Sequence, residues 1–291
     1  MATATATELA HRGPRRRRPG RPALKHLVLG FFVLLMIYPL LWMVASSFKP
    51  GELVLSEPGL IPSDVTFENY RDGWNALNYP FSRFFLNSLF VSVGAILGNL
   101  FSCSLAAYAL ARLEFRARRL YFAITLASVM LPLHVLVVPQ YIVFSELGMV
   151  NTYFPLLLPK FLATDAFFTF LMVQFIRTLP RELDQAAAID GAGPFRTFWS
   201  IILPLLKPAL ITTTIFTFIW TWNDFFTPLI YLTSTEMFTA PVALKSLVDS
   251  QTQQGIGILF AMSLLSLIPI LVFFVVAQKY LIRGIATTGI K

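Results

Sequence analysis

RELDQAAAIDGAGPFRTFWSIILP, residues 181–204, is the longest mixture of charged, polar and small residues between two apolar regions of the chain. Glu182 and Asp184 stand in the first turn of a predicted helix, where the positive end of the helix dipole favours acidic side chains. Gly191 is able to end that helix in a left-handed conformation, and Pro194 suits the first turn of a second helix. The stretch therefore predicts two short helices joined by a bend, too short and too charged to cross a bilayer.

The composition on either side of this stretch is that of a membrane protein. Of the 291 residues, 56% are apolar and 13% are charged, more apolar than a soluble domain. The single cysteine, Cys103, excludes an internal disulfide and a cysteine-based metal cluster. A net charge of +8 also suits nucleic-acid binding, but the basic residues gather in the N-terminal tail and at the ends of apolar segments. We therefore predict contact with membrane lipid and no nucleic acid partner.

Apolar runs of about 20 residues, the length that crosses a bilayer, mark the membrane spans. They predict an all-α, polytopic protein with a six-helix transmembrane domain in residues 26–281. The spans are expected near residues 27–47, 85–111, 120–143, 155–177, 208–231 and 257–281, with a loop at 178–207. Residues 1–25 are expected to form a disordered basic tail, and residues 282–291 a short flexible tail. A cleaved signal peptide is disfavoured, because the apolar run after the basic tail is longer than a signal-peptide core.

The distribution of lysine and arginine predicts the orientation. With the N-terminus inside the cell, 18 of the 23 basic residues lie on the inner side. Five lie on the outer side, including Lys49 and Lys160, the latter near the outer interface or facing protein. Because cytoplasmic segments carry such an excess, both termini and the loop at 178–207 are predicted to be cytoplasmic.

Glycine and proline predict close packing and breaks. Gly94 and Gly98 in the second span are four residues apart, which lets another helix approach closely. Pro132 and Pro139 each remove a backbone donor from the third span, so that helix should kink or break. In the outer segment before the second span, Thr66 is expected to cap a short helix.

The fifth predicted span has a polar face. Thr217, Trp220 with Thr221, and Asp224 recur every three or four residues, and such a face should contact protein or a water-filled cavity because lipid disfavours it. Pro228 is expected to kink the helix by freeing the carbonyl of Asp224. A polyhydroxylated ligand would suit carboxylate, amide and aromatic groups together, so the candidate substrate pathway consists of Thr217, Trp220, Thr221, Asn223 and Asp224. Alternatively, Asn223 and Asp224 bond each other or a partner subunit.

Residues 181–204 resemble the EAA loop of ABC-importer permeases, whose pattern is Glu-Ala-Ala, three residues, Gly-Ala, and then Leu-Pro about a dozen residues later. Gln185-Ala186-Ala187, Asp190-Gly191-Ala192 and Leu203-Pro204 fit this pattern, with glutamine in place of the usual glutamate. Trp222-Asn223-Asp224-Phe225 and both ends of the second span resemble the carbohydrate branch of these permeases, the maltose type. The resemblance covers roughly residues 27–291.

This resemblance implies a fold, a function and partners. The fold would be that of a type I ABC importer permease in the plasma membrane of a prokaryote. The chain would translocate a carbohydrate by alternating access, driven by a separate ATPase. The implied partners are a second homologous permease, an ABC ATPase dimer, an extracytoplasmic solute-binding protein and a small sugar. The residues implied to dock the ATPase are Glu182, Asp184, Gln185, Ala186, Ala187, Asp190, Gly191, Ala192 and Phe195.

Other functions find less support in the sequence. The chain contains no Gly-x-x-x-x-Gly-Lys-Ser/Thr motif, so ATP and magnesium are expected on the partner ATPase, and no cofactor, metal or catalytic residue is expected here. Glycerol-3-phosphate or another polyol ester is an alternative substrate. An ion-coupled secondary transporter is disfavoured, because no inverted repeat is visible and Asp224 is the one carboxylate in a convincing span. An intramembrane enzyme would need a nucleophile–base pair or a metal-ligand cluster, which the dispersed histidines do not suggest.

Overall fold

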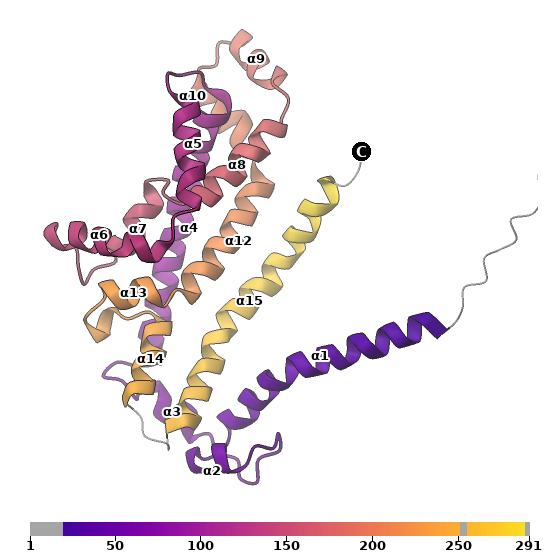
Figure 1. Ribbon diagram of the computed structural model, residues 1–291, viewed down its shortest axis with the longest axis vertical. Coiled ribbons are helices and arrows are strands. Elements are labelled where there is room, and N and C mark those ends of the chain that lie inside the picture. Colours follow the sequence, from indigo (N-terminus) through magenta and orange to yellow (C-terminus); the bar gives the residue numbers. More distant parts are fainter. Residues whose placement is uncertain (1–19, 251–254, 289–291) are drawn as a thin grey trace, which may run out of the picture.

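The computed structural model describes residues 20–250 and 255–288, and the regular secondary structure of these residues is helical throughout (Figure 1). The longer elements are α1 (Gly20–Ser47), α4 (Phe81–Arg112), α5 (Arg118–Val129), α6 (Leu133–Glu146), α7 (Phe154–Phe161), α8 (Ala166–Thr178), α9 (Glu182–Ile189), α12 (Lys207–Asn223), α14 (Ala240–Ser250) and α15 (Ile256–Thr288). The shorter ones are α2 (Gly51–Ser56), α3 (Glu68–Trp74), α10 (Pro194–Thr197), the π-helix η1 (Phe198–Ile202), α11 (Leu203–Leu205), α13 (Phe226–Tyr231) and the 3₁₀-helix η2 (Thr235–Met237).

Among the described residues, four helical segments are long and apolar enough to cross a membrane. They are Leu24–Ser47, Phe81–Arg112, Phe154–Thr178 and Ile256–Lys279. Two helix pairs pass the same test only together, because each pair is bent. The first joins Arg118–Val129 to His134–Glu146 at 108°, and the second joins Pro194–Leu205 to Lys207–Asn223 at 74°. If each bent pair crosses the bilayer once, the total is six, which agrees with the six-span prediction.

The third span breaks at a proline, as predicted. α5 ends at Val129 and α6 begins at Leu133, so Pro132 stands in the turn, where its ring keeps the preceding residue out of the helical conformation. Pro139 lies inside α6, which continues to Glu146. Of the two prolines, therefore, only Pro132 coincides with an interruption.

The fourth span is interrupted within its length. α7 ends at Phe161 and α8 begins at Ala166, and Ala163 between them has a φ of +55°. A left-handed alanine is unfavourable by itself, so the surrounding contacts must hold it.

The fifth span differs from its prediction. Instead of one kinked helix over 208–231, α12 ends at Asn223 and α13 begins at Phe226. The Oδ1 of Asp224 accepts a hydrogen bond of 3.1 Å from the backbone N–H of Thr227, in the first turn of the new helix. Pro228 then falls in the first turn of α13, where a missing N–H is tolerated. The expected kink is therefore a complete break.

The helices at both ends of the chain are longer than predicted. α1 begins at Gly20, so residues 20–25 of the expected disordered tail are helical. Pro22 lies in its first turn, where proline needs no hydrogen-bond donor. α15 continues to Thr288 through most of the expected C-terminal tail. The remaining parts of the two predicted tails, residues 1–19 and 289–291, lie outside the described residues.

α4 is the central helix and packs against α7, α8 and α12 (Figure 1). A Cβ added to Gly94 would lie 2.8 Å from Cδ2 of Leu157, and one added to Gly98 would lie 2.9 Å from Cβ of Lys160. α7 therefore approaches the backbone of α4 closely along the two glycines, and at Gly98 a larger residue would meet Cβ and the backbone carbon of Lys160.

The end of the molecule where α2 and α3 lie is opposite the end that carries α9 and α10 (Figure 1). Thr66 Oγ1 accepts a hydrogen bond of 3.2 Å from the N–H of Glu68, the first residue of α3, but the N-cap residue is Phe67 and not the predicted Thr66. The ammonium group of Lys49 is buried and donates to the carbonyls of Glu57 at 2.5 Å and Gly59 at 2.6 Å. The two hydrogen bonds from Lys49 therefore hold the segment after α1 in place.

Replacing Gly98 by valine should destabilise the protein by about 1–3 kcal/mol, because α7 has no room for the added carbons. Thermal unfolding of the purified chain in detergent should show the loss as a lower Tm. Gly30→Val is the matched control, since a Cβ at Gly30 meets nothing within 4 Å. Equal Tm values for the two variants would contradict the close packing of α4 on α7.

Candidate functional site

The stretch 181–204 forms the predicted helix, bend and helix at one end of the molecule (Figure 1). α9 ends in a Schellman motif, in which Ala192 N–H donates to the carbonyl of Ala187 at 2.8 Å and Gly191 N–H donates to that of Ala188 at 3.1 Å. Gly191 has the φ of +74° that this motif requires. Pro194 is the first residue of α10. Local sequence signals therefore determine the shape of this loop.

The second half of the loop is anchored in the core. Phe198, Ile202 and Leu206 are at most 1% exposed and belong to one cluster with buried residues of α4 and α8. The chain passes from α10 into a π-helical turn at Phe198–Ile202. Burial of three large side chains fixes the base of the loop on the bundle.

Arg112, in the last turn of α4, ties the first half of the loop to the same bundle. Its Nη1 lies 3.3 Å from Oδ2 of Asp184 in α9. Its Nη2 donates to the carbonyls of Ile176 at 3.0 Å and Leu179 at 2.7 Å, at the end of α8. The arginine side chain is only 5% exposed. One buried guanidinium therefore connects α4, α8 and α9.

The residues that the EAA resemblance implied for docking fall into two groups. The exposed group consists of Glu182, Gln185, Ala186, Asp190, Gly191 and Phe195. The inward group consists of Asp184, which pairs with Arg112, buried Ala187 and half-buried Ala192. The inward residues support the loop, and only the exposed group offers a surface to another molecule.

Sequence reasoning missed an apolar residue on that surface. Ile189, the last residue of α9, is 87% exposed, and Phe195 and Trp199 nearby are 71% and 41% exposed. The sequence signal for this exposed apolar residue was an isoleucine at the end of a short helix that consists mostly of alanine and acidic residues. With Gln185 and Ala186, these three residues form the exposed loop surface.

A second candidate site is a cavity of about 440 Å³ between α6, α7, α12 and α13. Trp220, Thr221 and Asp224 of the predicted pathway line it. Thr217 is buried outside its lining. Asn223 is exposed, and its Nδ2 donates to the carbonyl of Ile219 at 2.7 Å. The structure therefore brings three of the five pathway residues together.

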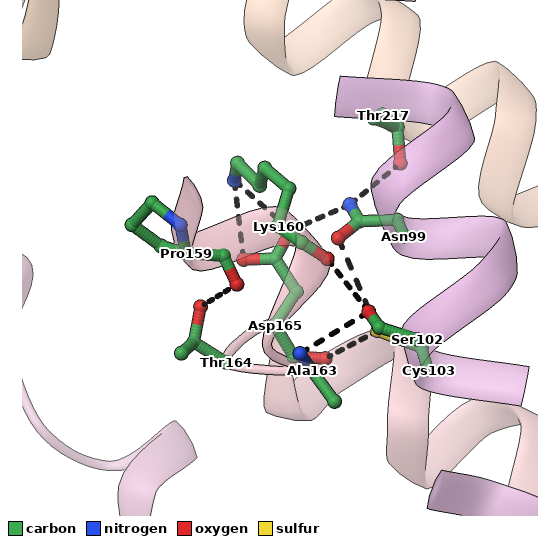
Figure 2. Close-up of polar contacts among 9 residues, drawn as sticks. All are labelled: Asn99, Ser102, Cys103, Pro159, Lys160, Ala163, Thr164, Asp165 and Thr217. Atoms are coloured by element: carbon green, nitrogen blue, oxygen red, sulfur yellow. Dashed lines mark hydrogen bonds and ion pairs between the residues drawn. The ribbon is translucent and has the colours of Figure 1, made fainter. Parts of the chain in front are cut away.

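An ion pair at the break between α7 and α8 forms one wall of this cavity (Figure 2). Lys160 Nζ lies 2.9 Å from Oδ2 of Asp165. Asn99 Nδ2 donates to the same oxygen at 2.6 Å and to the hydroxyl of Thr217 at 3.1 Å. Lys160 and Asp165 thus face protein, which is one of the two positions predicted for Lys160.

Ser102 of α4 satisfies the backbone groups that the same break leaves free. Its hydroxyl donates to the carbonyl of Lys160 at 2.6 Å and accepts from the N–H of Ala163 at 3.1 Å (Figure 2). Asn99, Ser102 and Gln140, which lines the cavity from α6, were not among the predicted site residues. Polar residues on the glycine-containing face of the second span were the signal for the first two.

Arg112→Gln should destabilise the chain by about 1–3 kcal/mol, because Asp184 and two carbonyls lose their partner. Asp184→Asn in the same background should recover part of this loss, since no unpaired carboxylate then remains. Chemical unfolding of the four members of this double-mutant cycle measures the coupling. Additive effects would show that the ion pair does not connect α4 to α9.

Comparison with known proteins identifies the family of this chain and several of its relatives. The model of the family described as binding-protein-dependent transport system inner membrane component matches residues 98–287. The diacetylchitobiose uptake system permease protein NgcG of Streptomyces coelicolor is 33% identical, over 88% of this chain and 85% of that protein. The sn-glycerol-3-phosphate transport system permease protein UgpE of Yersinia pestis is 34% identical, over 92% of this chain and 97% of that protein.

A solved structure shares the fold as well. One chain in the crystal structure of a bacterial ABC transporter involved in the import of the acidic polysaccharide alginate superposes with a TM-score of 0.80 at 26% identity. The match covers 92% of this chain and 99% of the other. This chain therefore belongs to the family of binding-protein-dependent transport system inner membrane components, the permeases of ABC importers.

Proposed function

We propose that this chain is the membrane-spanning subunit of an ATP-driven importer and translocates a carbohydrate by alternating access. The observation that carries the proposal is the loop at 181–204, whose exposed surface is held rigidly on the bundle by Arg112 and by the buried π-helical turn. A surface that another subunit pulls must be attached firmly to the part that it moves. The family to which the chain belongs supports this role.

The exposed loop surface suits docking into a groove of the partner ATPase. Ile189, Phe195 and Trp199 present apolar side chains, and Ala186 lets a partner approach the helix backbone closely. Gln185 stands where the EAA pattern has glutamate, so it would form hydrogen bonds with the ATPase but no ion pair. ATP and magnesium would be bound by the ATPase.

The arrangement of the helices supports the proposed orientation and the multi-subunit assembly. Arg112 and Arg118, two of the basic residues assigned to the cytoplasm, lie at the same end as the loop, whereas α2 and α3 lie at the opposite end (Figure 1). α1 is apolar and exposed over most of its spanning length, except near Ser46 and Ser47, which leaves its surface for lipid or for a second homologous permease. An ATPase dimer on the cytoplasmic side and a solute-binding protein on the outer side would complete the transporter of a prokaryotic plasma membrane, with both termini of this chain inside.

The cavity supports a polyhydroxylated substrate. Trp220 exposes half of its side chain, and the cavity lining adds hydroxyl, amide and carboxylate groups from Thr221, Gln140 and Asp224. Sugars present both apolar C–H faces and hydroxyl groups, which such a lining would recognise. The name of NgcG points to an oligosaccharide, whereas the name of UgpE keeps glycerol-3-phosphate as the second candidate.

One helix joins the two sites. α4 runs without interruption from Asn99, at the cavity wall, to Arg112, at the docking loop. If ATP-driven closure of the ATPases moves the loop, a rigid α4 would carry the motion to the wall that Asp165 and Lys160 form. The substrate would then meet two alternative states of the cavity, whose populations ATP binding shifts.

Gly191→Val should abolish co-purification of the ATPase subunit with this chain and ATP-dependent uptake by the whole transporter. A β-branched residue strongly disfavours the left-handed conformation that closes α9. A Cβ there meets nothing within 4 Å, so the effect would be conformational and not a clash. Affinity purification of the tagged chain from cells expressing the whole transporter measures the association.

Gly193→Val is the matched control for this experiment. Gly193 is two residues away and also meets nothing within 4 Å, but its φ is −74°, which valine adopts readily. This variant should retain the ATPase. Retention of the ATPase by Gly191→Val as well would contradict the docking role of the loop.

A further inference from the structure

The charges that line the membrane cavity do not balance. Among the described residues, the charged ones in its lining are Lys160, Asp165 and Asp224. Lys160 is already neutralised, because its Nζ lies 2.9 Å and 3.2 Å from the two carboxylate oxygens of Asp165. One cation against two carboxylates leaves a net charge of −1.

Asp224 carries this excess charge. Asp224 takes part in neither the Arg112–Asp184 nor the Lys160–Asp165 ion pair. Its Oδ1 accepts a hydrogen bond of 3.1 Å from the backbone N–H of Thr227, and the residue is half-buried. A single backbone donor leaves the second oxygen available to a ligand. In a half-buried site such a carboxylate acts on other charges more strongly than it would in bulk water.

The neighbouring tryptophan adds to the effect of the carboxylate. Trp220 packs against Phe167 and Phe168 with ring centroids 5.5 Å and 5.3 Å away, which fixes the position of its indole ring at the cavity. The face of an aromatic ring carries negative potential and attracts cations and C–H groups. The carboxylate of Asp224 and the indole ring of Trp220 therefore both favour a positively charged ligand over a negatively charged one.

We propose that this cavity selects its solute by charge: it accepts neutral sugars and positively charged amino sugars, and it disfavours phosphorylated or carboxylated ones. The proposal deepens the importer function proposed above and depends on it. It separates the two candidate substrates, because glycerol-3-phosphate carries negative charge.

The test measures the potential at the cavity directly. Thr221→Cys places a thiol in the lining, in a Cys103→Ala background that removes the native thiol. Membrane vesicles containing the whole transporter are treated with a cationic methanethiosulfonate, the trimethylammonium-ethyl reagent, or with an anionic one, the sulfonatoethyl reagent. The intact mass of this chain gives the rate of modification by each reagent. The ratio of the cationic to the anionic rate is then divided by the same ratio measured with 2-mercaptoethanol in solution.

The normalised cation-to-anion ratio should exceed unity by roughly tenfold. Residues three apart on a helical turn lie about 5–6 Å apart, and a unit charge at that distance in water changes each rate roughly threefold, in opposite directions for the two reagents. Asp224→Asn should bring the ratio close to unity. Asp64→Asn makes the same chemical change at an exposed site outside the cavity, so it should leave the ratio unchanged.

Several results would overturn charge selection. One is a normalised ratio near one, and another is a ratio that Asp224→Asn does not lower. A third is an absence of reaction with either reagent, which would show that solutes do not enter the cavity. The importer function has a separate readout in the same vesicles, namely association with the ATPase and ATP-dependent uptake. Intact association with a failed ratio would remove the charge selection alone, whereas lost association would remove the proposed function and leave the thiol ratio interpretable.

Discussion

The hydrogen bonds from α4 to the break between α7 and α8 are the interactions on which the rest of the structure depends. Inside an apolar bundle, a non-helical segment leaves backbone groups that water cannot satisfy. Ser102 supplies both a donor and an acceptor to that segment, and Asn99 binds the carboxylate of Asp165. The close approach of α7 at Gly94 and Gly98 makes these short contacts possible. Without α4 at this distance, the interruption would be unfavourable.

The two helix breaks have a common consequence for function. The break after Phe161 and the break at Asp224 both place charged groups in the wall of one cavity. In a continuous helix, by contrast, the backbone groups would hydrogen-bond within the helix. In α1, by contrast, a continuous helix with an exposed apolar surface suits contact with lipid or another spanning helix. Two interrupted spans thus supply the charged groups of the polar site, beside the uninterrupted α4, whereas α1 lies away from it (Figure 1).

α4 also relates the cavity to the loop at 181–204. Its polar residues contact the cavity wall, and Arg112 at its end binds both α8 and α9. A long helix transmits displacement better than a flexible connection, because its backbone hydrogen bonds and its packing on α8 and α12 act together. The physical link between the two sites is thus a single element whose ends contact different parts of the chain.

Local patterns in the sequence were enough to predict the all-helical, six-span class, the shape of the 181–204 loop and the break at Pro132. These features follow from local signals: apolar length, a glycine where the backbone must be left-handed, and prolines at helix starts. The packed structure was needed to show that the spans are interrupted at 162–165 and at Asp224, that Trp220 lines the cavity while Thr217 is buried behind it, and that Ile189 is exposed while Ala187 is buried. The interruption at 162–165 depends on side chains far away in the sequence, because Asn99 and Ser102 of α4 bind Asp165, the carbonyl of Lys160 and the N–H of Ala163.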